Sequence, residues 1–156
     1  NYREVNSYEH KRDIKCSSIE RLFMESKFQF IKPILKSVEY VVNENFEKDT
    51  TKSIDMNMNM TVSVKKSVVS STEASVSLTV NLGEKNNDDF PFYLNITESA
   101  EFKWCEDMEE KMVDQLLRQN APALLLSYLR PTVAQITSSS EFETFDIPFV
   151  NFSGQS

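Results

Sequence analysis

Strict alternation of apolar and polar residues marks the middle of the chain. From Ile54 to Val64 every even position is apolar, and Asn, Thr and Ser fill most odd positions. Successive side chains of a strand point to opposite faces of its sheet, so this period predicts strands that are buried on one face only. The even phase persists further along the chain, and three antiparallel strands are predicted, at 54–69, 74–82 and 90–104.

The pattern is less regular before residue 54. The segment 19–31 has strand composition, and Phe28 and Phe30 share one face, although the phase shifts near Met24, where a bulge would fit. Residues 32–53 open at Pro33 and contain apolar residues at spacings that are partly helical. We expect a long apolar connection with a turn of helix here, because loops of this length are usually functional or disordered and this one is too apolar to be disordered.

The period changes to that of a helix after Trp104. An apolar stripe recurs at helical spacing, and acidic residues lie in its first turns, where they complement the helix dipole. Pro122 is suited to the first turn of a second helix that extends to about Ser138, and Pro131 lies inside it. The stripe consists of Met108, Met112, Val113, Leu116 and Leu117.

These elements predict an α+β fold. A four-stranded antiparallel sheet would carry a long C-terminal helix on one face, kinked or split near Pro122 and Pro131. With 156 residues the chain is long enough for one domain, and we expect a flexible lead-in at 1–17, a single domain at 18–152 and a short tail at 153–156.

Composition limits the cellular compartments and the classes of binding partner that we expect for this protein. The formal net charge is −7 and the basic stretches are short, so nucleic acid is disfavoured as a partner. No apolar run approaches the roughly 20 residues of a membrane helix, which argues against membrane insertion. Cys16 and Cys105 are far apart in sequence, and two isolated thiols indicate a reducing, cytoplasmic location.

A search for catalytic or metal chemistry finds no convincing constellation. His10 is the one histidine and lies in the polar lead-in. Neither cysteine has a second ligand at metal-binding spacing, and there is no phosphate-loop or dinucleotide motif. Acidic residues 106–110 are better explained as a solvated helix start than as a cation site. The sequence therefore predicts a protein that is not an enzyme and needs no cofactor.

Without catalytic or metal-binding residues, the function is expected to depend on binding surfaces. The odd face of the predicted sheet is polar and nearly uncharged, which fits plain solvent exposure better than a partner surface. The connection at 34–46 and the tail at 142–152 contain more apolar side chains than one loop and one tail need. Two interpretations are equally open: the two segments pack on each other, or they line an apolar groove or an oligomer interface.

The order of elements and the final third of the chain resemble the SecB export-chaperone family. The most specific stretch is "APALLLSYLRPTVAQITSSSEFETFDIPFVNF", 121–152. Its Pro near the helix start, its Tyr128-x-Arg130 segment and its ending at Pro148–Phe152 are similar to that family's helix and Pro-Val-Asn-Phe ending. The likeness spans about residues 19–152.

The resemblance implies a cytosolic, ATP-independent holdase that assembles as a dimer or a tetramer and binds unfolded or precursor polypeptides during protein export. It also implies SecA as a partner and apolar grooves lined by the connection and the tail. The expected client-binding residues are Ile34, Leu35, Val38, Tyr40, Val42, Phe46, Phe142, Phe145, Ile147, Phe149 and Phe152.

Two features depart from the family pattern. The family continues into a second C-terminal helix, and we expect a divergent member without it, because the sequence stops soon after Phe152. Asn95 and Lys27 stand where the family uses acidic residues of its sheet face for SecA. One alternative is therefore a SecB-like chaperone dedicated to a single client, such as an antitoxin. Another is a structural or adaptor oligomer on the same scaffold.

Overall fold

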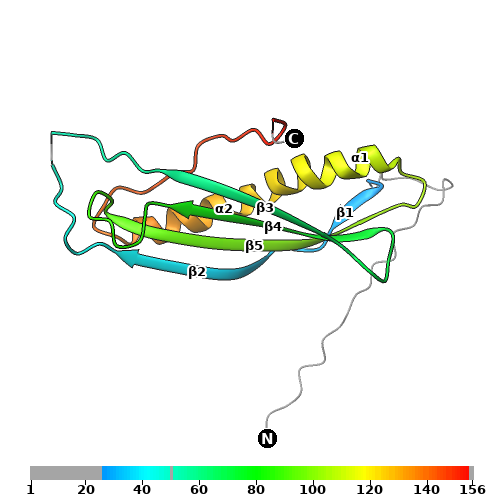
Figure 1. Cartoon of the computed structure of the whole chain (residues 1–156), viewed down its shortest axis with the longest axis horizontal. Coiled ribbons are helices and arrows are strands. Elements are labelled where there is room, and N and C mark those ends of the chain that lie inside the picture. The colour runs from blue at the N-terminus through cyan, green and yellow to red at the C-terminus, as the bar shows by residue number, and fades with distance from the viewer. Residues whose placement is uncertain (1–25, 50, 155–156) are drawn as a thin grey trace, which may run out of the picture.

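One antiparallel sheet and one long helix make up the computed structural model, which describes residues 26–49 and 51–154 (Figure 1). The predicted α+β class with a helix on one face is confirmed. The described strands are β1 (Phe28–Phe30), β2 (Ile34–Val42), β3 (Met58–Lys66), β4 (Glu73–Leu82) and β5 (Phe92–Trp104). The helix consists of α1 (Glu110–Gln115), the π-helical segment η1 (Leu116–Asn120) and α2 (Ala121–Ser138).

The strand order is β1-β5-β4-β3, and β2 also pairs with β5. β5 is long enough to hold two partners along one edge. β1 pairs with its C-terminal part, where Phe28 lies opposite Trp104, and β2 pairs with its N-terminal part. The break between β1 and β2 contains Pro33, which has no backbone N–H to donate to the ladder.

Residues 34–42 form a strand, so the expectation of a connection with a turn of helix at 32–53 is wrong for this part, and the sheet has five strands instead of four. The reason is a bulge. The register shifts between Leu35 and Ser37, so that Leu35 lies opposite Glu98 and Val38 lies opposite Ile96. Leu35 and Val38 are three apart in sequence but share a face, which mimics helical spacing.

The alternating segments are strands, as predicted. In β4 every even residue is buried and every odd one is half-buried, and Phe28 and Phe30 both face the helix side, opposite Trp104 and Phe102. β3 begins later than predicted, at Met58. The buried face packs against α2 and supplies most of the core, including Val76, Leu78, Val80, Leu94, Ile96 and Phe102 from the sheet and Leu125, Leu129 and Val133 from α2.

The helix begins at Glu110, several residues later than the sequence suggests, and is divided near Pro122 as predicted. Pro122 cannot donate an N–H, and its ring would clash with the preceding turn of a regular helix. A π turn relieves this conflict, because the N–H of Ala121 donates to the carbonyl of Leu116, five residues back. α2 continues through Pro131 without a break.

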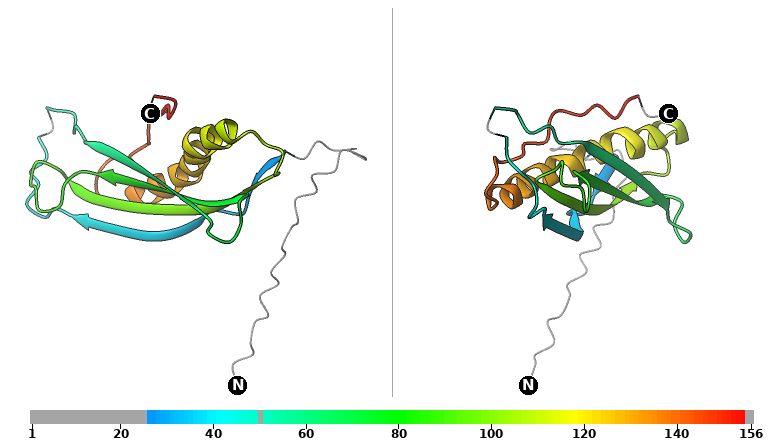
Figure 2. Two further views of the ribbon diagram at one scale, coloured as in Figure 1. Left: turned by 45° about the vertical axis from the view of Figure 1, so that its right-hand side comes forward. Right: turned by 60° about the vertical axis from the view of Figure 1, so that its left-hand side comes forward.

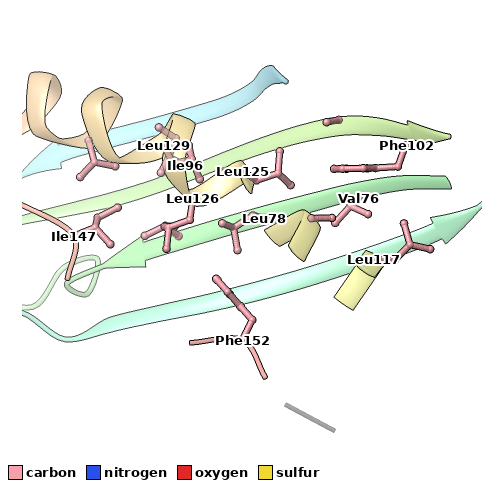
Figure 3. Close-up of a cluster of buried hydrophobic side chains, with 14 of the residues drawn as sticks. Val76, Leu78, Ile96, Phe102, Leu117, Leu125, Leu126, Leu129, Ile147 and Phe152 are labelled. Carbon is pink, nitrogen blue, oxygen red and sulfur yellow. The ribbon is translucent and has the colours of Figure 1, made fainter. Parts of the chain in front are cut away.

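The segment that follows α2 returns along the helix on the β3 side of the sheet. Figure 3 shows Phe152 beside β3 and Ile147 near Leu126 of α2, and both residues are buried. Figure 2 shows that the helix covers one face of the sheet and leaves the other bare. The molecule is therefore a two-layer structure with one polar sheet face.

Several expectations fall outside the described residues. The predicted lead-in at 1–17, the start of the first predicted strand and Cys16 are among them. Cys105 is buried just after β5 and is disulfide-bonded, so the expectation of an isolated thiol is wrong for this residue. Among the described helices, none is long and apolar enough to cross a membrane.

Candidate functional site

The outer strand β2 exposes a row of apolar side chains. It pairs with β5 only, so within the described residues its other edge has no strand partner. Leu35, Val38 and Val42 face the helix side and are 46%, 42% and 37% exposed. Ile34 and Val41 are exposed on the opposite face. An exposed apolar edge strand of this kind is a template for pairing with another chain.

The helix supplies a neighbouring apolar wall. Tyr128 of α2 is exposed and meets Phe30 of β1 edge to face, with ring centroids 6.5 Å apart. Ile31, in the break between β1 and β2, is also exposed. We call Phe30, Leu35, Val38, Val42 and Tyr128 the edge surface. It lies on the side of α2 away from the tail.

The tail occupies the other side of α2 and is held there by polar contacts. The backbone N–H of Phe145 donates to Thr137 Oγ1 at 2.9 Å. Arg130 Nη2 donates to the carbonyl of Pro148, also at 2.9 Å. These bonds fix the tail while Ile147 and Phe152 enter the core. The two sides of α2 therefore differ, since among residues 26–49 and 51–154 the tail covers only the β3 side.

A small pocket lies at the end of the sheet where the connection and the tail meet. Its volume is about 190 Å³, and its apolar lining consists of Ile54, Met56, Pro91, Phe92, Phe142 and Phe145. Lys48, Lys52 and Glu143 also line it. Phe46 packs edge to face on Phe142 with centroids 5.6 Å apart. At this place the connection and the tail pack on each other, which is the first of the two interpretations that the sequence left open.

The eleven expected client-binding residues do not form one surface. Tyr40, Phe46, Phe142 and Phe145 are half-buried around the pocket end, and Ile147 and Phe152 belong to the core. The exposed ones are Ile34, Leu35, Val38, Val42 and Phe149. Sequence reasoning missed Phe30, Ile31 and Tyr128. The phase shared by Phe28 and Phe30 placed Phe30 on the helix side, but nothing in the sequence signalled that it stays exposed.

Glu98 is the one charged residue on the helix-facing side of β4 and β5, two strands that are described over their whole length. Its side chain is 7% exposed, and Oε2 accepts no hydrogen bond from any described residue. Burial raises the pKa of this carboxyl, because the ionised form loses its hydration.

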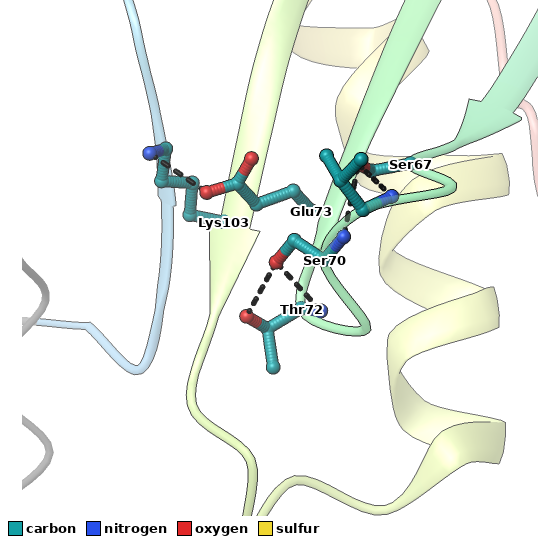
Figure 4. A network of polar contacts seen from close by, with 6 residues as sticks. Ser67, Ser70, Thr72, Glu73 and Lys103 are labelled. Carbon is teal, nitrogen blue, oxygen red and sulfur yellow. Dashed lines mark hydrogen bonds and ion pairs between the residues drawn. The ribbon is translucent and has the colours of Figure 1, made fainter.

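On the opposite, polar face of the sheet, side-chain hydroxyl groups of neighbouring strands form hydrogen bonds with one another. Thr79 and Thr97 share a hydrogen bond at 2.8 Å, and Ser77 donates to Ser99 at 3.0 Å. At one end Lys103 pairs with Glu73 at 2.9 Å, beside a hairpin that Ser67, Ser70 and Thr72 brace with hydrogen bonds (Figure 4). The hydroxyl groups of this face thus pair with one another across neighbouring strands, which explains why the face is rich in Ser and Thr.

Comparison with known proteins agrees with this architecture. Residues 24–155 match the family model of SecB, the preprotein translocase subunit. An uncharacterised protein of Methanocaldococcus jannaschii is 27% identical over 129 residues, which cover 81% of this chain and 80% of that protein.

A solved structure also shares the fold. The SecB-like chaperone of Mycobacterium tuberculosis, in complex with a ChAD peptide from the HigA1 antitoxin, superposes with a TM-score of 0.64. The superposition covers 79% of this chain and 90% of that chain at 12% sequence identity. Because the family model spans all of the described residues, the chain belongs to the SecB family.

Proposed function

We propose that this protein is an ATP-independent chaperone that binds extended, apolar segments of non-native polypeptides on the edge surface. The observation that carries the proposal is the exposure of Leu35, Val38 and Val42 along a strand whose outer edge pairs with no other described strand. An extended client segment can pair its backbone with such an edge and pack alternate side chains on the apolar row. The pocket near Phe142 would hold one further client side chain.

Family membership supports a chaperone role without enzymatic activity, located in the cytoplasm and acting in protein export. By the same resemblance we propose a homo-oligomer, a dimer or a tetramer, with SecA as a partner. A dedicated client is the second candidate, because the SecB-like chaperone of similar fold was solved with an antitoxin peptide.

A structural or adaptor role is the third candidate. The outer edge of β2, which no described strand covers, supports it equally, since a second copy can cover an exposed strand. In that case the edge surface would be buried in the assembly. Binding of an environment-sensitive dye to the intact oligomer separates the two cases: a chaperone keeps accessible apolar surface, and an adaptor does not.

The direct test is capture of an unfolded, slowly refolding client without ATP, followed as delayed refolding against protein concentration. Leu35→Ser combined with Val38→Ser should weaken capture several-fold. The matched control is Val68→Ser with Val69→Ser, because those valines are also exposed but lie at the distant β3–β4 hairpin.

Three outcomes separate the candidates. Loss of capture in the edge variant alone supports the proposal. Equal loss in both variants, or no delay in the wild-type protein at a large excess over client, rejects it. If the edge variant captures normally but its oligomer dissociates, the edge surface is an interface between copies of this chain.

A further inference from the structure

A buried carboxyl without a hydrogen-bond partner is costly, and within the part of the chain that the structure describes Glu98 is such a group. All its neighbours in the even phase of β4 and β5 are apolar, so Glu98 interrupts an otherwise uniform core face. Transfer of a charged group out of water is unfavourable unless another group pairs with it. The buried carboxyl is therefore a group whose missing partner a ligand can supply.

The strand register places Glu98 next to the edge surface. Its cross-strand neighbours are Leu78 on β4 and Leu35 on β2. Leu35 belongs to the edge surface, and only strand β2 lies between Glu98 and the open edge of the sheet. A side chain laid across Leu35 from the outside thus approaches the carboxyl of Glu98.

The cations among the described residues leave this carboxyl unpaired. Lys36 is the nearest in sequence to Leu35 and occupies the bulge, but it is exposed and makes no ion pair among the described residues. Lys27, Lys66, Lys85 and Lys103 pair with other carboxylates. Glu98 therefore has no cationic partner among the described residues, and a cation from another molecule can supply one.

We propose that Glu98 is a specificity-determining residue of the edge surface, and that it accepts the Lys or Arg side chain of a client segment that is otherwise apolar. Such side chains lay an apolar stem along hydrophobic surface and carry the charge at the far end. The stem would cover Leu35 and Val38, and the cationic end would meet Glu98. An acidic residue at the same place in the client would be repelled. This inference rests on the proposed chaperone function.

The test uses two labelled peptides and the whole protein. One peptide is an extended apolar segment with a single central lysine, and the other has the same sequence with that lysine acetylated. Fluorescence anisotropy should show that the wild-type protein binds the lysine peptide about tenfold more tightly, as expected of a hydrogen bond between charged groups. In Glu98→Gln this ratio should fall close to one.

The matched control is Glu101→Gln. Glu101 lies on the same strand, three residues away, and is exposed on the opposite face of the sheet. The change removes the same charge, so it corrects for the general attraction of a cationic peptide to a chain of net charge −7. Thermal unfolding of both variants verifies that they fold.

The outcomes distinguish this inference from the proposed function. If Glu98→Gln keeps the tenfold ratio, or if Glu101→Gln abolishes it as well, the role of Glu98 is overturned. If the wild-type protein binds both peptides equally, Glu98 reads no charge, although the chaperone proposal stands. If it binds neither peptide, both are rejected.

Discussion

Arg130 on α2 holds the tail through Pro148. Its Nη2 donates to the Pro148 carbonyl oxygen at 2.9 Å, and its guanidinium carbon lies 5.9 Å from the centre of the Phe149 ring. The contact joins the middle of the helix to a segment without regular secondary structure. It helps to explain why the tail covers one side of α2.

Arg130→Ala should loosen the tail. The lost hydrogen bond and cation–π contact together predict a fall of about 1–3 kcal/mol in the free energy of unfolding. Amide hydrogen exchange across 145–152 should accelerate more than exchange in β4. Arg118→Ala is the control, because Arg118 is exposed on η1. Equal effects of the two substitutions would show that Arg130 has no specific hold on the tail.

The two phenylalanines of the tail should differ in their contribution to stability. Phe152 is 4% exposed and Phe149 is 89% exposed. Phe152→Ala should lower the free energy of unfolding by about 3–5 kcal/mol, because it leaves a cavity in the core. Phe149→Ala should cost less than about 1 kcal/mol, which is the size of an exposed cation–π contact. Denaturant unfolding measures both, and similar losses would contradict the described position of the tail.

The stability of Glu98→Gln should depend on pH. Burial raises the folded-state pKa of Glu98 above its ordinary value of 4.5. The folded protein therefore binds the proton more tightly than the unfolded chain does, and the associated stability is present below pH 4.5 and lost as the pH rises through the folded pKa. Glu98→Gln cannot ionise, so it should exceed the wild-type protein by about 1–2 kcal/mol at pH 8.

This advantage should shrink as the pH falls below 4.5, where the wild-type carboxyl becomes protonated in both the folded and the unfolded state. Urea unfolding at several pH values measures it, with Glu101→Gln as the exposed control. A difference between Glu98→Gln and wild type that does not change with pH would mean that the carboxyl of Glu98 is well solvated in the folded protein.

Gly83 should not tolerate a side chain. It has φ of 69°, and a Cβ built on it would lie 2.3 Å from the carbonyl oxygen of Phe92. Gly83→Ala should therefore lower the free energy of unfolding by more than about 1 kcal/mol. At Gly154 an added Cβ meets nothing within 4 Å, so Gly154→Ala serves as the control. Thermal unfolding compares them, and an unchanged melting temperature for Gly83→Ala would reject the strained geometry.

The sequence correctly predicted the central strands and the helix because each of them is buried on one side. Burial on one face imposes a period of two on β4 and β5, and of 3.6 on α2, so the pattern itself reports the structure. Pro122 likewise predicted where the helix is divided, because its missing N–H removes a hydrogen bond of the helix at that position.

The sequence could not predict β2. An edge strand is exposed on both faces, so its residues need not alternate, and the bulge at Lys36 shifted the phase further. Sequence spacing also failed to separate Phe149 from Phe152 in the tail. Whether such a residue is buried depends on contacts with α2 and β3, which are distant in the chain.

What the sequence by itself determined is the set of elements that are patterned by one buried face, together with the resemblance of its final third to the SecB family. What only the tertiary structure decided is which apolar residues remain exposed and that Glu98 lies buried without a hydrogen-bond partner among the described residues. The physical reason is that periodicity records the direction of a side chain relative to its own element, whereas exposure depends on what other elements are placed over it.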